Sequence, residues 1–213
     1  DGATSQTLLD LVEHQAATNG WRFLGWREVP VDPDSLGRTA FISRPVIRQF
    51  AVAPAEEEID PDTLERRLYV LRKCIEREAV RAGYNRDQLY LVSLSGRTVI
   101  YKGMMMASQL PRFYRDLSDH LVESPFAIVH QRYSTNTFPS WRLAQPFRTL
   151  AHNGEINTIR GNRNWLAARE PSLHSPLFGD DLKKLFPLIE PESSDSASLD
   201  NALEFLMRGG RSL

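Results

Sequence analysis

The chain has 213 residues, of which 41% are hydrophobic and 25% are charged, and its formal net charge at pH 7 is −1. These values are ordinary for one globular domain or a little more, and they give no basic surface for nucleic acid or a membrane. No apolar run approaches the roughly 20 residues that a membrane span needs, and residues 1–15 lack the features of a signal peptide. The single cysteine excludes an internal disulfide and fits a reducing compartment.

In the first part of the chain, the apolar pattern predicts a helix that ends near Asn19-Gly20, because glycine is common at helix C-termini. Residues rich in β-formers predict strands over 21–31 and 46–52. Asp60 and Pro61 are typical of a helix start, since aspartate can cap and proline suits the first turn. We expect that helix to end at residues 82–83.

In the second part, residues 89–103 predict a hairpin that turns at Ser95-Gly96. A short helix is expected over about 107–117. Strands over 126–132 and 149–152 and helices over 157–169 and 198–208 complete the prediction. The strands and helices are interleaved, and tight hairpins favour antiparallel pairing over a parallel sheet.

Residues 130–165 carry the densest set of amide, charged and glycine positions, and they read HQRYSTNTFPSWRLAQPFRTLAHNGEINTIRGNRNW. Arg132 follows an apolar strand, where a guanidinium can bind a carboxylate through two parallel hydrogen bonds. A surface salt bridge is the ordinary alternative. The Asn153 side chain and the Gly154 backbone N–H can together form an oxyanion hole, although Asn-Gly is also a strong signal for a hairpin turn.

Other polar residues have ordinary structural readings. Asp195 precedes a predicted helix, where an N-cap is usual, and Gln145 is read as a turn residue. Cys74 lies in the middle of a helix near its apolar stripe, which favours a structural role over a reactive thiolate. His130 and His152 fit no zinc-ligand spacing, so we expect no metal site.

The whole run resembles the glutamine amidotransferases whose nucleophile is an N-terminal cysteine, and within them the glutaminase domain of the glutamate synthase large subunit. The resemblance covers most of the chain, and the segments that carry it are 25–30 (GWREVP), 93–105 with IYKGM, 130–139, 147–165 and 199–211. Residues 33–45 and 171–184 are less distinctive.

The resemblance implies a role for each candidate residue. Arg132 would bind the substrate carboxylate with Thr135 close by, and Asp195 would bind the α-amino group. Asn153 and Gly154 would form the oxyanion hole, and Gln145 would belong to the substrate-binding set.

The implied fold is an α+β N-terminal-nucleophile fold, with two stacked antiparallel sheets between helical layers. The sequence contains neither the N-terminal cysteine nor the family's closing segments. We therefore expect residues 1–213 to be a single incomplete domain, an internal part of the amidotransferase domain that is inactive alone.

In the complete enzyme that the resemblance implies, glutamine is hydrolysed to glutamate and ammonia. The ammonia then serves the reductive amination of 2-oxoglutarate in a synthase domain of the same chain, with FMN and an iron–sulfur cluster. Electrons come from an NAD(P)H-oxidising small subunit or from ferredoxin. None of these cofactors is expected in residues 1–213, and no nucleic-acid or membrane partner is expected. The expected location is the cytoplasm, or the plastid stroma in a photosynthetic eukaryote.

Two alternatives remain from other readings of the sequence. The chain could be a glutamine-sensing module that lost its nucleophile in evolution, and the reading frame upstream of Asp1 distinguishes this case. It could also be the amidotransferase domain of a different synthase, against which the matches at 25–30 and 100–104 argue.

Overall fold

The computed structural model describes residues 2–56, 58–132 and 138–212. Its first unit is a two-stranded sheet covered by a helix. Strands β1 (Trp21–Glu28) and β2 (Arg48–Pro54) pair antiparallel, and α1 (Gly2–Thr18) packs on β1. The register shifts at Gly25, whose φ of +141° favours glycine. The predicted end of the first helix at residues 19–20 is confirmed, and both predicted strands form with shifted ends.

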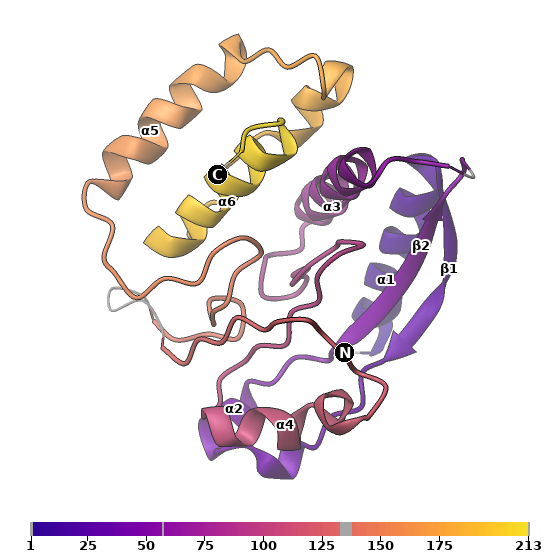
Figure 1. Cartoon of the computed structure of the whole chain (residues 1–213), viewed down its shortest axis with the longest axis vertical. Coiled ribbons are helices and arrows are strands. Elements are labelled where there is room, and N and C mark those ends of the chain that lie inside the picture. The colour runs from indigo at the N-terminus through magenta and orange to yellow at the C-terminus, as the bar shows by residue number, and fades with distance from the viewer. Residues whose placement is uncertain (1, 57, 133–137, 213) are drawn as a thin grey trace.

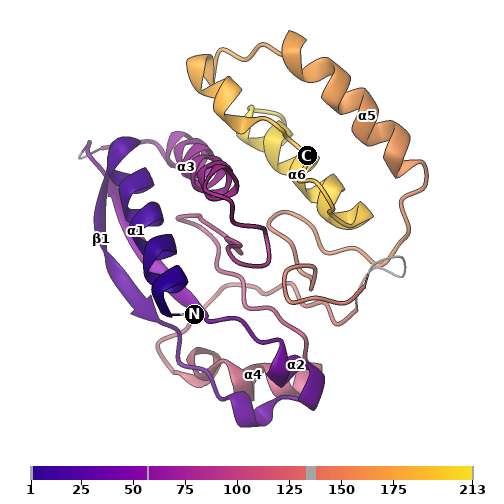
Figure 2. The ribbon, with the colours of Figure 1, turned by 180° about the vertical axis from the view of Figure 1, so that it is seen from behind.

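Helix α3 (Pro61–Arg81) lies between α1 with the sheet on one side and the C-terminal helices on the other (Figures 1 and 2). The Asp60 carboxylate accepts hydrogen bonds from the backbone N–H groups of Asp62 and Thr63 at 3.1 and 3.0 Å, so the predicted cap is confirmed. Ala82 is the C-cap, also as predicted.

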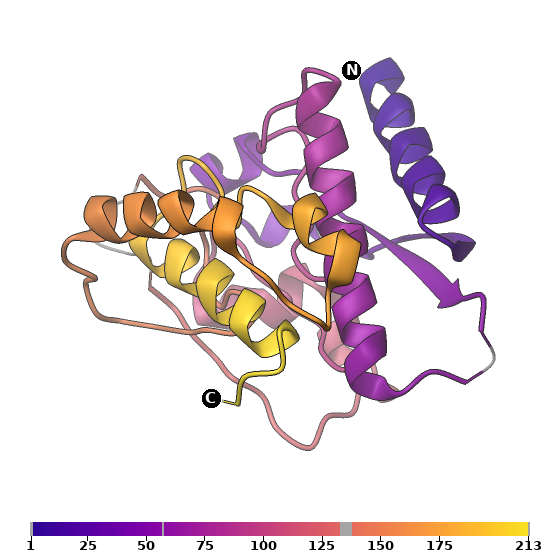
Figure 3. The same ribbon diagram turned by 90° about the horizontal axis from the view of Figure 1, so that it is seen from above.

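Two apolar clusters cover opposite sides of α3. The first contains Leu68, Leu71 and Ile75 together with Val12, Ala16, Trp21 and Leu91. The second contains Tyr69, Val70 and Cys74 together with Phe178, Leu182, Leu185 and Leu188. Figure 3 shows α1 beside α3 on the first of these sides. Burial on both sides makes α3 the central element of the described structure.

The predicted helix over 107–117 is broken into a 3-10 turn, α4 (Leu110–Phe113) and a second 3-10 turn. Tyr114 interrupts it because its backbone is extended and forms an isolated bridge with Val31. A third apolar cluster, built on Val29, Phe113 and Tyr114, holds this region against the end of β1.

The strands predicted over 89–103, 126–132 and 149–152 are not formed in the described residues, whose only sheet is β1–β2. At Ser95-Gly96, the polar groups bind the Glu65 carboxylate at 2.7–2.9 Å instead of a second strand. Residues 126–129 are exposed and have no neighbouring strand. Because strand hydrogen bonds need a partner strand, an apolar pattern alone does not form one. The mixed α+β class is confirmed, and the stacked sheets are absent from the described residues.

The C-terminal part contains α5 (Ile159–Arg169) and α6 (Asp195–Arg208), joined by two 3-10 segments and irregular chain (Figure 1). Helix α6 begins at Asp195 and not at residue 198, because the Ser194 hydroxyl caps it by accepting from the backbone N–H of Ala197 at 3.1 Å. Within the described chain, no helix combines the length and apolar character required for a bilayer span.

Candidate functional site

The predicted oxyanion turn, Asn153-Gly154, is exposed. It follows a loop, residues 145–152, whose two ends are joined by the Gln145 side chain. The His152 backbone N–H donates to Gln145 Oε1 at 2.7 Å, and Gln145 Nε2 donates to the His152 carbonyl at 2.9 Å. Gln145 itself is only 6% exposed. The turn therefore stands on a buried base. The hairpin reading of Asn-Gly is wrong here, because no strands flank the turn.

The interior of this loop is also fixed. The Phe147 backbone N–H donates to the Leu150 carbonyl at 2.8 Å. The Thr149 backbone N–H and hydroxyl both donate to Asp200 Oδ1, at 2.7 and 2.8 Å. Asp200 is fully buried in α6, and Phe147 packs against Ala197 of the same helix. Helix α6 thus anchors the loop that carries the turn.

Asp195 lies at the start of α6 and reaches the chain just beyond the turn. Its Oδ2 accepts from the Ile156 backbone N–H at 3.0 Å, and its Oδ1 accepts from the Ser196 N–H at 2.7 Å. The N-cap reading of Asp195 is wrong, because Ser194 has that role. The positive end of the helix dipole favours a charged carboxylate at this position. The fold therefore brings Gln145, the Asn153-Gly154 turn and Asp195 into one region.

Gly154 lies close to the imidazole of His152. A Cβ atom there would lie 2.7 Å from His152 Cε1, a separation that real Cβ atoms essentially never show. A side chain at position 154 would therefore require the imidazole to move. In the described part of the chain, no group of three or more His, Cys, Asp or Glu side chains could hold a metal ion.

Among the described residues, no hydrogen bond or ion pair joins Arg132, another predicted site residue, to this region. Arg132 is exposed, and its backbone N–H donates to His130 Nδ1 at 3.1 Å. Its side chain forms no ion pair with any described residue, so the salt bridge that its residue type also allowed does not form there. Thr135 lies outside the described residues. The roles of both residues stay predictions.

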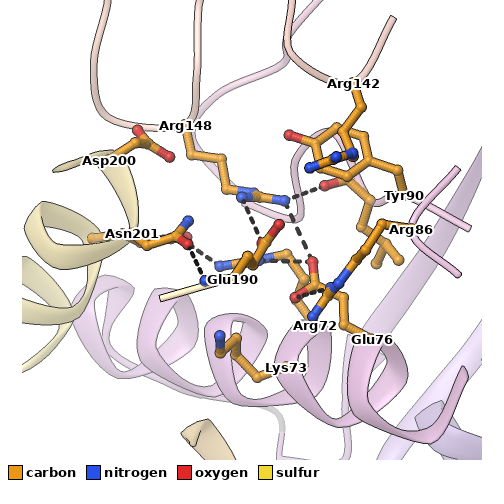
Figure 4. Close-up of polar contacts among 12 residues, drawn as sticks. Arg72, Lys73, Glu76, Arg86, Tyr90, Arg142, Arg148, Glu190, Asp200 and Asn201 are labelled. Atoms are coloured by element: carbon orange, nitrogen blue, oxygen red, sulfur yellow. Dashed lines mark hydrogen bonds and ion pairs between the residues drawn. The ribbon is translucent and has the colours of Figure 1, made fainter. Parts of the chain in front are cut away.

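A buried layer of charge lies beneath the loop, and sequence reasoning missed it (Figure 4). Its members come from α3, the segment after α3, the loop and the C-terminal part: Arg72, Glu76, Arg86, Arg148, Glu190 and Glu204. The Arg72 guanidinium contacts Glu76 at 2.8 Å and also binds Glu204. The i, i+4 spacing of Arg72 and Glu76 was the one local signal.

Burial and the neighbouring charges in this layer shift the pKa values of its glutamates. Burial raises the pKa of Glu76, but the four surrounding cations outweigh it and lower that pKa to about 2. At Glu204, burial prevails over the attraction of Arg72 and Arg148 and raises the pKa. The Arg148 guanidinium, next to Thr149, reaches Glu76 at 3.4 Å and Glu190 at 3.7 Å. The layer thus connects the loop to α3.

Cys74, the single thiol of the sequence, is buried in the second cluster of α3. Burial raises the pKa of this thiol, which disfavours the thiolate that a nucleophile needs. Its structural placement agrees with the prediction.

Comparison with known proteins identifies the family to which the sequence is similar. Residues 1–213 match the family described as "Glutamine amidotransferases class-II". The chain is 48% identical over 203 residues to the protein named glutamate synthase [NADPH] large chain of Azospirillum brasilense, which covers 94% of this chain and 13% of that protein. It is 50% identical over 193 residues to the ferredoxin-dependent glutamate synthase, chloroplastic, of Oryza sativa subsp. japonica, which covers 91% of this chain and 12% of that protein.

The glutamate synthase [NADPH] large chain of Bacillus subtilis is 47% identical over 188 residues, with 88% of this chain and 12% of that protein covered. The chain thus spans a small part of the length of these relatives, and the resemblance to glutamate synthase large chains is confirmed across most of its own length. Because the family match extends over all 213 residues, the chain belongs to the class-II glutamine amidotransferases.

Proposed function

We propose that this chain is the glutamine-binding and oxyanion-stabilising part of the glutaminase domain of a glutamate synthase. The observation that carries the proposal is the exposed Asn153-Gly154 turn on its buried base, with Asp195 bound to the next segment at Ile156. Two donors held in one direction can stabilise the negative charge of a tetrahedral intermediate without reorganisation.

Each end of the substrate then has its own residue. The amide carbon is attacked beside the turn, where the Asn153 side chain and the Gly154 N–H receive the oxyanion. Asp195 accepts hydrogen bonds from the α-amino group, and Arg132, with Thr135 nearby, binds the α-carboxylate. The nucleophile is a cysteine outside residues 1–213, since Cys74 is buried within α3. Residues 1–213 alone are therefore expected to be inactive, and they belong to an N-terminal-nucleophile fold of stacked sheets.

The released ammonia passes to a synthase domain elsewhere in the complete chain, where 2-oxoglutarate is reductively aminated. FMN and an iron–sulfur cluster supply the electron transfer there, with electrons from an NAD(P)H-oxidising subunit or ferredoxin. We expect these groups to be held by other parts of the complete enzyme. The proposed location is the cytoplasm or, in a photosynthetic eukaryote, the plastid stroma.

The test is Asn153→Ala in the complete enzyme. Glutamine hydrolysis should lose about 10²–10³ in kcat, the loss typical of one missing oxyanion donor, with a smaller change in KM. Glutamate synthesis from added ammonia should persist, because that chemistry uses another domain. Asn164→Ala, at an exposed asparagine of α5, is the matched control and should change neither rate.

Two outcomes would contradict the proposal. A wild-type glutaminase rate in the Asn153→Ala enzyme would leave Asn153-Gly154 as a turn without a catalytic role. A complete chain that binds glutamine but never hydrolyses it would identify a sensing module instead.

A further inference from the structure

We propose that Gln145 is a positioning residue that sets the direction of the Asn153-Gly154 donors, and that it does not contact the substrate. The inference rests on the proposed function, because it assigns a role within the same site. It differs from the substrate-binding role that the family resemblance implies for Gln145.

The Gln145 side-chain amide bonds both backbone polar groups of His152, as a residue of a neighbouring strand would. Its Oε1 accepts from the His152 N–H at 2.7 Å, and its Nε2 donates to the His152 carbonyl at 2.9 Å. Both ends of the amide are therefore engaged by one residue. Gln145 is buried, whereas Asn153 and Gly154 are exposed. The side chain thus lies beneath the turn and supports it from the inside.

Because the peptide bond is planar, the contact between Gln145 and the His152 carbonyl also fixes the direction of the Asn153 N–H. The carbonyl of His152 and the N–H of Asn153 belong to the same peptide plane and point in opposite directions in a trans peptide. Because Gln145 binds the carbonyl, the N–H of Asn153 points away from Gln145, and the position of the Asn153 Cα is fixed by the same plane. The backbone rotations of Asn153 then start from this fixed plane and set its side chain and the Gly154 N–H. One buried amide therefore sets the starting direction of the whole donor turn.

The base on which Gln145 stands is itself fixed. The Lys102 ammonium donates to the Arg142 carbonyl at 2.9 Å and lies 5.0 Å from the centre of the Phe147 ring. The Ala144 backbone N–H donates to the Ser140 carbonyl at 3.1 Å. Contacts on both sides of Gln145 in the sequence thus restrain its backbone, which is what a residue that orients another group requires.

The chain offers a matched control in Gln109. Its Nε2 donates to the Ser35 carbonyl at 2.6 Å, and its Oε1 accepts from the Met106 N–H at 2.8 Å. Like Gln145 it bonds one backbone N–H and one carbonyl, but of two different residues, and it lies next to Leu110 of the third apolar cluster, which is separate from that of Phe147. Substitution of Gln109 therefore reproduces the loss of two hydrogen bonds without touching the loop.

The experiment compares Gln145→Ala and Gln109→Ala in the complete enzyme, with ammonia-dependent synthesis as the measure of integrity. In Gln145→Ala, kcat for glutamine hydrolysis should fall about tenfold or more, because small misplacements of catalytic groups are costly, while KM changes little. Gln109→Ala should keep both parameters. The loss from Gln145→Ala should largely disappear in an Asn153→Ala background, because the side-chain donor that it orients is already gone.

A second variant, Gln145→Glu, keeps the side-chain length and gives a pH readout. The introduced carboxylate can accept from the His152 N–H but repels the His152 carbonyl, whereas the protonated form donates to that carbonyl again. Its glutaminase kcat relative to the unaltered enzyme should therefore rise as pH falls. This variant also serves if Gln145→Ala loses ammonia-dependent activity and so has not folded.

The outcomes distinguish failure of the proposed function from failure of the positioning role of Gln145. An unaltered complete enzyme without glutaminase activity would overturn the proposed function and this inference with it. If the unaltered enzyme is active but substitution of Gln145 raises KM alone, adds fully to Asn153→Ala or leaves kcat intact, Gln145 does not position the turn.

Discussion

Asp195 is a carboxylate with structural contacts and a proposed ligand role. It accepts from the backbone N–H groups of Ile156 and Ser196, so it joins the start of α6 to the segment after the oxyanion turn. From the motifs around them, the sequence alone identified Asp195, Asn153 and Gly154 as candidate site residues. It could not reveal that Ser194 caps the helix or that Gln145 binds His152, because hydrogen-bond partners depend on tertiary contacts.

The Asp195→Asn variant tests recognition of the amino group. The amide oxygen can still accept from Ile156, so the local structure should persist, but the negative charge that binds an ammonium is lost. In the complete enzyme, KM for glutamine should rise by about tenfold or more, as expected for a lost charge-assisted hydrogen bond. Hydrolysis of a des-amino analogue should change much less. Equal penalties on both substrates, measured by steady-state kinetics, would show a purely structural residue.

At the scale of elements, the sequence predicted correctly those helix ends that depend only on neighbouring residues. Helix α3 was predicted at both ends, because Asp60, Pro61 and Gly83 act on the backbone next to them. The strands over 126–132 and 149–152 failed, because strand formation depends on a distant partner. In the second case the backbone bonds to side chains instead, since Thr149 is held by Asp200 and His152 by Gln145.

The cap of α6 gives a prediction at this scale. Ser194→Ala removes the buried hydroxyl that accepts from the Ala197 N–H, and the free energy of unfolding should fall by about 1 kcal/mol. Ser194→Thr keeps the hydroxyl and should lose less. Urea unfolding of the 213-residue chain followed by circular dichroism measures both. An equal loss in the two variants would mean that packing around Ser194, and not the cap, is what matters.

At the scale of the whole molecule, the buried charge layer joins segments that are far apart in the sequence. Arg72 from α3 binds Glu204 from α6. Arg148 from the site loop contacts Glu76 and Glu190 (Figure 4). No sequence pattern shows these pairs, apart from the i, i+4 spacing within α3, because each partner is brought by the fold. The layer therefore links the central helix to the loop beneath the candidate site.

Removal of Arg72 tests that link. Arg72→Met would leave the buried Glu204 without the guanidinium that binds it and would remove one of the four cations around Glu76. Loss of one partner of a buried ion pair costs about 3–5 kcal/mol. Arg72→Lys should recover only part of the loss, because one ammonium cannot reproduce two contacts made by separate guanidinium nitrogens. Arg81→Met, at the exposed pair with Glu78, is the control and should leave the unfolding midpoint unchanged.

Substitution of Arg72 should also affect the candidate site, because Glu76 contacts Arg148, the neighbour of Thr149. In a complete enzyme that still folds, Arg72→Lys should lower the glutaminase kcat more than ammonia-dependent synthesis. Arg81→Met should lower neither. If Arg72→Lys destabilises the protein in urea unfolding but leaves glutaminase kcat intact, the charge layer supports the fold without orienting the loop. If Arg72→Met leaves stability unchanged, the ion pairs of Arg72 contribute nothing beyond what an apolar contact would provide.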